Sequence, residues 1–308
     1  MFFIFIRNET LVDKAKSSKK LPNFIWAIIL ALLFLNIGSI LGSIVIIPLI
    51  SLISSIPLFS SNPDFLMLLS SLLSFLGISL LVFFRVSKIE KRSISSIGFS
   101  KYNWFRKYSI GFLIGLILMS LVVLVLYLFG FVSLEQSPSQ PVGKFALLNI
   151  FIVLIGWIIQ GGTEEILTRG WLMNILSARY NVNIGLFISS VLFSLLHLSN
   201  LNVNIIAILN IILVGYLFGL YVIKTNDLWG ACGMHSAWNF AQGNLFGFEV
   251  SGLNVSIGSL FDFNLTGNEL LSGGVFGPEA GIASTLILII GIVAILVLDR
   301  KGFFNKYF

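Results

Sequence analysis

Long apolar runs separated by short polar segments dominate the chain. A transmembrane helix needs about 20 predominantly apolar residues, and eight runs approach or exceed that length. They predict an all-α fold, a polytopic membrane helix bundle of about eight transmembrane helices that forms one membrane domain over residues 1–308. The predicted spans are residues 22–53, 64–84, 108–133, 145–178, 182–199, 203–223, 228–246 and 280–298.

Positively and negatively charged residues are concentrated in different segments between these runs. Lys and Arg gather in the tail 1–21, in the loop 85–107 and at the C-terminus, whereas the loop 247–279 has carboxylates and no Lys or Arg. Cytoplasmic loops of membrane proteins are enriched in Lys and Arg. We therefore expect cytoplasmic N- and C-termini, an extracytoplasmic loop at 247–279, and an integral multi-pass protein of the plasma (cytoplasmic) membrane with the lipid bilayer as a partner.

Composition narrows the function classes. The chain is 57% hydrophobic and only 10% charged, whereas roughly a quarter of the residues of a soluble domain are charged. This excludes an ordinary cytosolic globule, a disordered chain and a nucleic-acid-binding protein, despite the net charge of +6. The one cysteine, Cys232, excludes an intramolecular disulfide.

A few ionisable side chains fall inside the predicted spans. Both histidines of the chain, His197 and His235, lie in spans, and Glu164 and Glu165 are the carboxylates placed well inside one. An ionisable residue at the bilayer centre costs about 2.5–3.5 kcal/mol on insertion scales and usually marks a functional site. These four residues are therefore the first candidates for chemistry.

Helical spacing predicts how the acidic cluster is arranged. Glu165 and Arg169 are an i,i+4 pair that can form an ion pair, and Glu164 is turned by about 100° from Glu165. Glu164 can therefore point away from Arg169 and stay available, as a general base that acts near neutral pH requires. Taken alone, the cluster also fits a helix end at the membrane interface that Arg169 neutralises.

The histidines extend the same site. His235 and Asn239 share one helix face, and Glu164 and His197 stand equally far from the predicted turn at Tyr180–Asn181. However, His197 directly precedes a polar turn, which predicts a position near the outer face, and His235 is expected deeper. A short or tilted fifth helix, or a deep cavity, would bring them together. A lone membrane histidine also fits a simple interhelical hydrogen bond.

These elements resemble the CPBP family of intramembrane proteases, which includes CAAX proteases, bacteriocin-processing enzymes and Abi-like proteins. The family motifs Glu-Glu-x-x-x-Arg, Phe-x-x-x-His and His-x-x-x-Asn occur here in order, at 164–169, 193–197 and 235–239. The resemblance covers residues 145–246, the expected catalytic core, and implies hydrolysis of a peptide bond in a membrane-associated or prenylated peptide or protein. The position after His197-Leu198, Pro in many relatives, is Ser199 here.

The resemblance also implies roles for single residues. Glu164 and His197 would activate a water, His235 and Asn239 would stabilise the oxyanion, and Glu165, Arg169 and Phe193 would support them. No cofactor is certain. A zinc ion is a further option, with Glu164, His197 and His235 as its ligands, although a metal-free glutamate mechanism fits equally well. Cys232 is expected to be a small packing residue and not a nucleophile.

Two other classes of function remain open. A non-catalytic membrane immunity or scaffold protein of the same family is the main alternative, although such proteins tend to lose motif residues. A proton-coupled transporter would show inverted repeats and broken helices. Neither appears in the sequence, and because no proline lies between Pro141 and Pro278, we expect a site built on unbroken helices.

Overall fold

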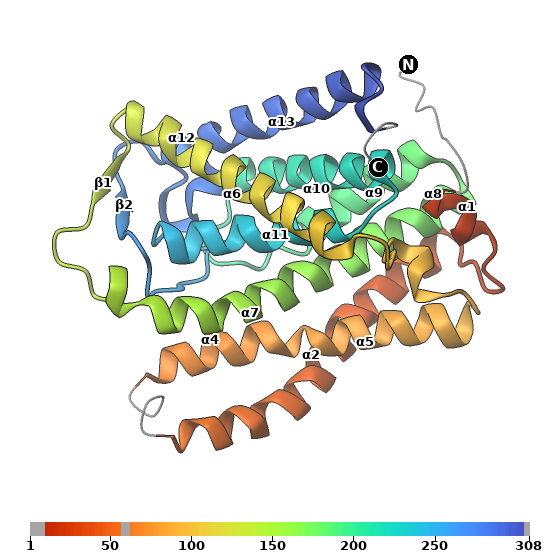
Figure 1. Cartoon of the computed structure of the whole chain (residues 1–308), viewed down its shortest axis with the longest axis horizontal. Coiled ribbons are helices and arrows are strands. Elements are labelled where there is room, and N and C mark those ends of the chain that lie inside the picture. Colours follow the sequence, from red (N-terminus) through yellow and green to blue (C-terminus); the bar gives the residue numbers. More distant parts are fainter. Residues whose placement is uncertain (1–9, 57–61, 305–308) are drawn as a thin grey trace.

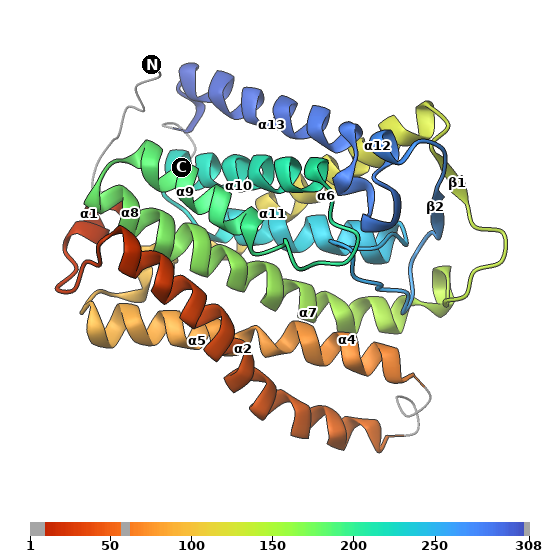
Figure 2. The ribbon, with the colours of Figure 1, turned by 180° about the vertical axis from the view of Figure 1, so that it is seen from behind.

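The computed structural model describes residues 10–56 and 62–304 as a bundle of roughly parallel and antiparallel helices (Figures 1 and 2). The fold class predicted from the sequence, an all-α membrane bundle, is confirmed. The α-helices are α1 (Leu11–Lys16), α2 (Phe24–Ser54), α4 (Pro63–Ser74), α5 (Leu76–Phe84), α6 (Trp104–Leu128), α7 (Leu147–Glu165), α8 (Asn174–Arg179), α9 (Val182–Leu195), α10 (Ile205–Thr225), α11 (Trp229–Phe240), α12 (Glu269–Ser272) and α13 (Ile282–Arg300).

Shorter elements connect or extend these helices. Two strands, β1 (Val132–Leu134) and β2 (Phe263–Leu265), pair antiparallel and tie the loop after α6 to the loop before α13. Three π-helical segments continue α-helices: η1 (Arg85–Ile89), η4 (Ile166–Met173) and η5 (Ala241–Leu245). The remaining short turns of 3₁₀ helix are η2 (Ile94–Ile97), η3 (Gly143–Phe145), η6 (Gly274–Phe276) and η7 (Pro278–Ala280).

Six helical segments of the described chain are long and apolar enough to span a membrane. These segments make the chain an integral membrane protein. The predicted spans at 182–199 and 228–246 are also helical but shorter, because α9 has 14 residues and α11 has 12 before it continues as η5. The count of eight spans and the cytoplasmic placement of the termini therefore remain predictions.

The spanning helices divide into a core and a periphery. In their most apolar windows, only 17%, 33% and 28% of the residues of α2, α6 and α13 are buried inside the protein, against 61% for both α7 with its extension and α10. Large apolar side chains on the outer helices face outward, as lipid contact requires. Glu164, Glu165 and Arg169 of the predicted site belong to the inner helix α7 and its extension η4, which keeps them away from the acyl chains.

Glycines let α11, which carries His235 and Asn239, approach α6 closely. A Cβ atom added to Gly111 would overlap the carbonyl oxygen of Gly230, and one added to Gly233 would overlap the carbonyl oxygen of Tyr108. Small residues allow such backbone contact between membrane helices. The position of α11 is therefore fixed by backbone packing along its outer side, while its opposite side faces α7.

The two ends of the bundle differ in architecture. In both views α1 and α8 lie at one end, and the strand pair β1–β2 lies at the other (Figures 1 and 2). We refer to them as the α1 end and the β end. The described part of the predicted cytoplasmic tail, residues 10–21, belongs to the α1 end, and the loop 247–279, which includes β2, belongs to the β end.

Candidate active site

The Glu-Glu-x-x-x-Arg motif lies where α7 changes from α- to π-helix. Glu165 is the last residue of α7, and η4 then continues the same helix without a break as far as Met173. The expectation of a continuous helix is correct, but its regular α geometry is not. π-helical segments inside α-helices are rare and frequent at functional sites; here the wider turn follows directly on the carboxylate pair.

Glu165 and Arg169 form the predicted ion pair. Arg169 Nη1 donates to Glu165 Oε1 over 2.9 Å, and both side chains are 0% exposed. The same nitrogen donates to Thr168 Oγ1, and the guanidinium lies 4.3 Å from the centre of the Phe193 ring. Burying two charges is costly unless they are paired and hydrogen-bonded, so this pair is a fixed part of the core.

Glu164 behaves differently from its neighbour, as the helical turn between them predicts. Its side chain is 16% exposed and lines a cavity. Its Oε2 atom lies 3.4 Å from His235 Nε2 and, like Oε2 of Glu165, has no hydrogen-bond partner among the described residues, but only Glu164 of the two lines the cavity. Glu164 is therefore the carboxylate of the pair that is available to a water or a substrate.

His235 lies between the two carboxylates. Its Nδ1 is 2.9 Å from Glu165 Oε1 and its Nε2 faces Glu164 Oε2. Since a carboxylate paired with Arg169 can only accept, His235 Nδ1 carries a hydrogen and donates it. This bond fixes the ring so that Nε2 points at the available carboxylate.

Phe193 connects the two histidines. Its ring centre lies 4.9 Å from that of His197 and 5.9 Å from that of His235, both edge-to-face. The His197 ring is further fixed because Nδ1 lies 2.8 Å from the carbonyl oxygen of Phe193. A carbonyl can only accept, so Nδ1 is the donor, and Nε2 of the neutral ring is left as an acceptor.

The conflict over depth is resolved by the length of α9. This helix ends at Leu195, so its 14 residues span roughly 21 Å at 1.5 Å per residue, less than the bilayer core of about 30 Å. His197 lies in the turn after α9 and not within a helix, contrary to the predicted span 182–199. The short fifth helix brings this turn down to the level of Glu164.

One cavity of about 190 Å³ brings the predicted residues together. Its lining includes all four proposed catalytic residues, Glu164, His197, His235 and Asn239, and also Phe193. A buried water needs roughly 10–15 Å³ of such volume, so the cavity has room for several waters. The grouping expected from sequence around one solvent-filled space is therefore present.

Two polar residues of the site were not predicted from the sequence. Gln160 lines the cavity, and its Oε1 accepts a hydrogen bond of 2.9 Å from Asn239 Nδ2, which fixes the Asn239 amide. Thr168 donates to the carbonyl oxygen of Glu164 over 2.5 Å. Gln160 stands one helical turn before Glu164 in an apolar run, a signal that could have identified it.

A tight turn from the loop 247–279 forms one wall of the cavity. Val250, Ser251 and Leu253 line it, and Val250 and Leu253 exchange both backbone hydrogen bonds. Ser251 and Gly252 have φ values of +51° and +77°, as a two-residue type I′ turn requires. We call residues 250–253 the hairpin turn.

Hydrogen bonds to Glu279 hold the hairpin turn in place. This carboxylate is 6% exposed, and its Oε1 accepts from the backbone and the hydroxyl of Ser251 at 2.5 and 2.9 Å. Gln242 and Trp238, which follow His235 along the chain, also donate to it. The wall is therefore tied to the same helix that carries His235 and Asn239.

The zinc ligands expected from the sequence, Glu164, His197 and His235, are not arranged as a metal site. Among residues 10–56 and 62–304, no three His, Cys, Asp or Glu side chains are grouped so that they could hold one ion. His235 and His197 each donate from Nδ1, so each could present only Nε2 to an ion, and the grouping of the side chains decides the question. The residues present do not fit the zinc site that the sequence left as an option, and no step below is routed through a metal.

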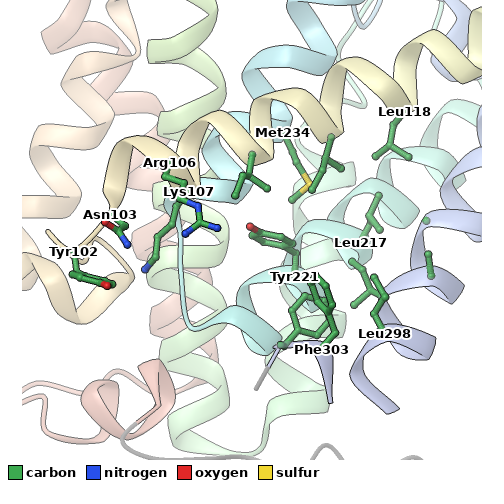
Figure 3. A pocket seen from close by; sticks show the side chains of 16 residues that line it. Tyr102, Asn103, Arg106, Lys107, Leu118, Leu217, Tyr221, Met234, Leu298 and Phe303 are labelled. Carbon is green, nitrogen blue, oxygen red and sulfur yellow. The ribbon is translucent and has the colours of Figure 1, made fainter. Parts of the chain in front are cut away.

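Another cavity, of about 460 Å³, lies between α6, α10 and α13 and contains none of the predicted site residues (Figure 3). It is mainly apolar, with Arg106 and Lys107 near the α1 end. Met234 of α11 lines this cavity, whereas its neighbour His235 lines the other. Cys232 lines neither; its Sγ lies 3.8 Å from the carbonyl oxygen of Gly162, which fits a packing residue.

Comparison with known proteins identifies the part of the chain that holds this site. Residues 145–241 match the family model of the type II CAAX prenyl endopeptidase Rce1-like proteins. The matched region contains all three motifs and ends just after Asn239. No curated protein and no solved structure matches the chain significantly.

Proposed function

We propose, from the match of residues 145–241 to the family model of the Rce1-like type II CAAX prenyl endopeptidases, that the chain is an intramembrane endopeptidase that uses a glutamate-activated water. The observation that carries the proposal is the shared cavity, which Glu164 lines together with His197, His235 and Asn239. The substrate is a membrane-associated peptide or protein, and the family match makes a prenylated peptide one of the probes to compare.

Glu164 and His197 hold and activate the water. A carboxylate oxygen of Glu164 accepts one hydrogen of the water, and Nε2 of neutral His197 accepts the other. As the water oxygen bonds to the carbonyl carbon of the substrate, its proton passes to Glu164, and the C=O double bond becomes a C–O⁻ single bond. When this intermediate collapses, the C–N bond breaks and Glu164 returns the proton to the leaving amine.

His235 and Asn239 stabilise the negative charge that develops on the substrate oxygen. Asn239 Nδ2 donates one hydrogen to Gln160 and has a second one for the oxyanion. His235, whose Nδ1 donates to Glu165, contributes in its doubly protonated form, in which Nε2 also carries a hydrogen directed at the site. A preorganised donor of this kind contributes about 2.7–4 kcal/mol to catalysis.

Glu165, Arg169 and Phe193 act as positioning residues. Arg169 neutralises Glu165, Glu165 holds the His235 ring, and Phe193 packs on both histidines and on the guanidinium. None of the three needs to touch the reacting bond. Their variants should impair the rate without creating a new substrate preference.

The test is cleavage by purified protein in detergent. The probes are a quenched fluorogenic peptide with a farnesylated C-a-a-X end, the same peptide without the farnesyl group, and the membrane peptidome of cells that express the chain. Glu164→Gln and His197→Ala should each abolish cleavage, while Glu269→Gln, an exposed carboxylate at the start of α12 outside the catalytic cavity, should not. Full turnover by Glu164→Gln would contradict the assignment.

The alternative is a non-catalytic membrane partner, such as an immunity or scaffold protein. The intact cavity argues against it, since a binding role does not require an unpartnered buried carboxylate oxygen beside two oriented histidines. A cellular phenotype that persists unchanged in Glu164→Gln cells, together with an identical membrane peptidome, would favour this alternative.

A further inference from the structure

We propose that the catalytic cavity opens toward the extracytoplasmic side of the membrane, so that its substrates are peptide segments exposed on that side. This inference rests on the proposed function and specifies which substrates can reach the site. It places a cytoplasmic prenylated C-terminus out of reach and selects exported or membrane-anchored peptides.

The positive charges of the bundle identify its cytoplasmic end. Nearly all described Lys and Arg residues outside the site lie at the α1 end, and the β end has only Lys144. Juxtamembrane Lys and Arg residues mark the cytoplasmic side. The described cations of the α1 end are Lys14, Lys16, Lys19, Lys20, Arg85, Lys88, Lys91, Arg92, Lys101, Arg106, Lys107, Arg179, Lys224, Arg300 and Lys301.

Aromatic side chains mark the membrane interface at the same end. Tyr102, Trp104 and Phe105 stand beside these cations and are 74%, 47% and 67% exposed. Exposed aromatic residues at the ends of spanning helices typically lie at the headgroup level. The loop that leads into α6 therefore fits the anionic inner leaflet, in agreement with its positive charge.

The loops that line the catalytic cavity come from the opposite end. Asn200 lies in the turn after α9, and Val250, Ser251 and Leu253 belong to the hairpin turn. Asn200 Nδ2 donates to the carbonyl oxygen of Ser251 over 2.9 Å, which joins the two segments. Within the described chain, no loop of the α1 end contributes a lining residue.

A groove continues from the cavity toward the β end. It has a volume of about 490 Å³, lies between α4 and the segment 253–257, and shares Ser71 and Leu253 with the catalytic cavity. Met67, Leu68 and Ile257 give it apolar walls, while Asn254 and Ser256 supply polar groups. A groove of this mixed character suits an extended peptide, whose side chains need apolar contacts and whose backbone needs hydrogen-bond partners.

The mainly apolar cavity near the α1 end does not provide a second entrance. It shares no lining residue with the catalytic cavity, and α11 separates the two, with Met234 on one side and His235 on the other. The close contact of α6 and α11 at Gly111 and Gly233 closes the gap between these helices. A substrate that approaches from the cytoplasm therefore meets packed helix backbone before it reaches His235.

The first experiment measures which side each end faces. Cys232 is buried and 3% exposed, so the unaltered chain gives the labelling background. Ser256→Cys in the groove and Lys101→Cys at the α1 end are both exposed loop positions. A membrane-impermeant maleimide should label Ser256→Cys in spheroplasts and Lys101→Cys only in inside-out vesicles. The reverse pattern would overturn the proposal.

The second experiment tests whether the groove is the route of entry. Ser71→Cys lies where the groove meets the cavity, and Ser51→Cys is an exposed serine near the same end of α2 that lines neither. Cleavage of the peptide probes is compared before and after each variant is labelled with a bulky maleimide. We expect at least a tenfold loss for Ser71→Cys and no change for Ser51→Cys.

The outcomes separate this inference from the proposed function. An unchanged rate after complete labelling of Ser71→Cys would refute the groove as the entry route, even with an active enzyme. If the unlabelled protein cleaves no peptide, the proposed function fails, yet the labelling of Ser256→Cys and Lys101→Cys still decides which side the groove faces. Cleavage only of probes sealed on the cytoplasmic side would likewise overturn the inference.

Discussion

The buried ion pair beneath the histidines gives the most quantitative prediction. Replacing Arg169 by Met removes a guanidinium that is 0% exposed and donates to both Glu165 and Thr168. Glu165 keeps its bond from His235 but loses its compensating charge. Breaking a buried pair in this way costs about 3–5 kcal/mol, and the lost contact with the Phe193 ring at 4.3 Å favours the upper part of that range.

The assay is reversible unfolding of the purified protein in mixed micelles of increasing denaturing detergent. Arg169→Met should lose about 3–5 kcal/mol of unfolding free energy, which corresponds to a hundredfold to several-thousandfold change in the equilibrium constant. The double variant Glu165→Gln/Arg169→Met should recover part of this loss, because it leaves no uncompensated charge. Lys101→Met, at an exposed position, is the matched control and should leave the midpoint unchanged.

Two results would contradict the mutual compensation of Glu165 and Arg169. If Arg169→Met is as stable as the wild type, the pair does not neutralise a buried charge. If the double variant is less stable than Arg169→Met by the full cost of Glu165→Gln alone, the two side chains do not compensate each other. In both cases Glu165 could not be the fixed acceptor that orients His235.

Three further predictions concern packing, pH and catalysis. Gly111→Val should destabilise the protein strongly, because its Cβ would overlap the backbone of α11, whereas Gly291→Ala, which meets only leucine side-chain ends, should be tolerated; thermal unfolding in detergent compares them. Burial raises the pKa of Asp227 to about 6, against the opposing effect of Lys107. The contribution of Asp227 to the free energy of unfolding should therefore be largest below pH 4 and should fall by up to about 3 kcal/mol as the pH rises through 6. The unfolding midpoint of Asp227→Asn should not show this fall. Asn239→Ala should lower kcat by about 10²–10³-fold with little change in KM; an equal loss carried by KM alone would refute its role as an oxyanion donor.

Local spacing was sufficient to predict the acidic half of the site. The i,i+4 relation of Glu165 and Arg169 depends on one helical turn, and the ion pair is present at 2.9 Å. The angular separation of Glu164 and Glu165 likewise predicted that one carboxylate would be buried and the other available. The equal distance of Glu164 and His197 from the turn at Tyr180 agrees with their place in the lining of one cavity.

The rest of the site depends on contacts that no local pattern encodes. Apolar periodicity does not reveal that α9 ends at Leu195, because Leu196 and Leu198 continue the apolar pattern beyond that residue. The hairpin turn reaches the cavity because Glu279, far along the chain, accepts hydrogen bonds from Ser251. The π-helical segment after Glu165 is not visible in residue spacing either, since no proline or glycine pair marks its start.

The central claim is that Glu164 activates a water and does not itself attack the peptide bond. It is tested most directly by a single turnover in water enriched in heavy oxygen, with the enzyme in excess over the peptide. A water that attacks the carbonyl carbon delivers its oxygen to the new carboxyl group, so we predict heavy oxygen in the product and none in Glu164. A product without heavy oxygen in this first turnover, together with label in the Glu164 carboxylate, would contradict the account.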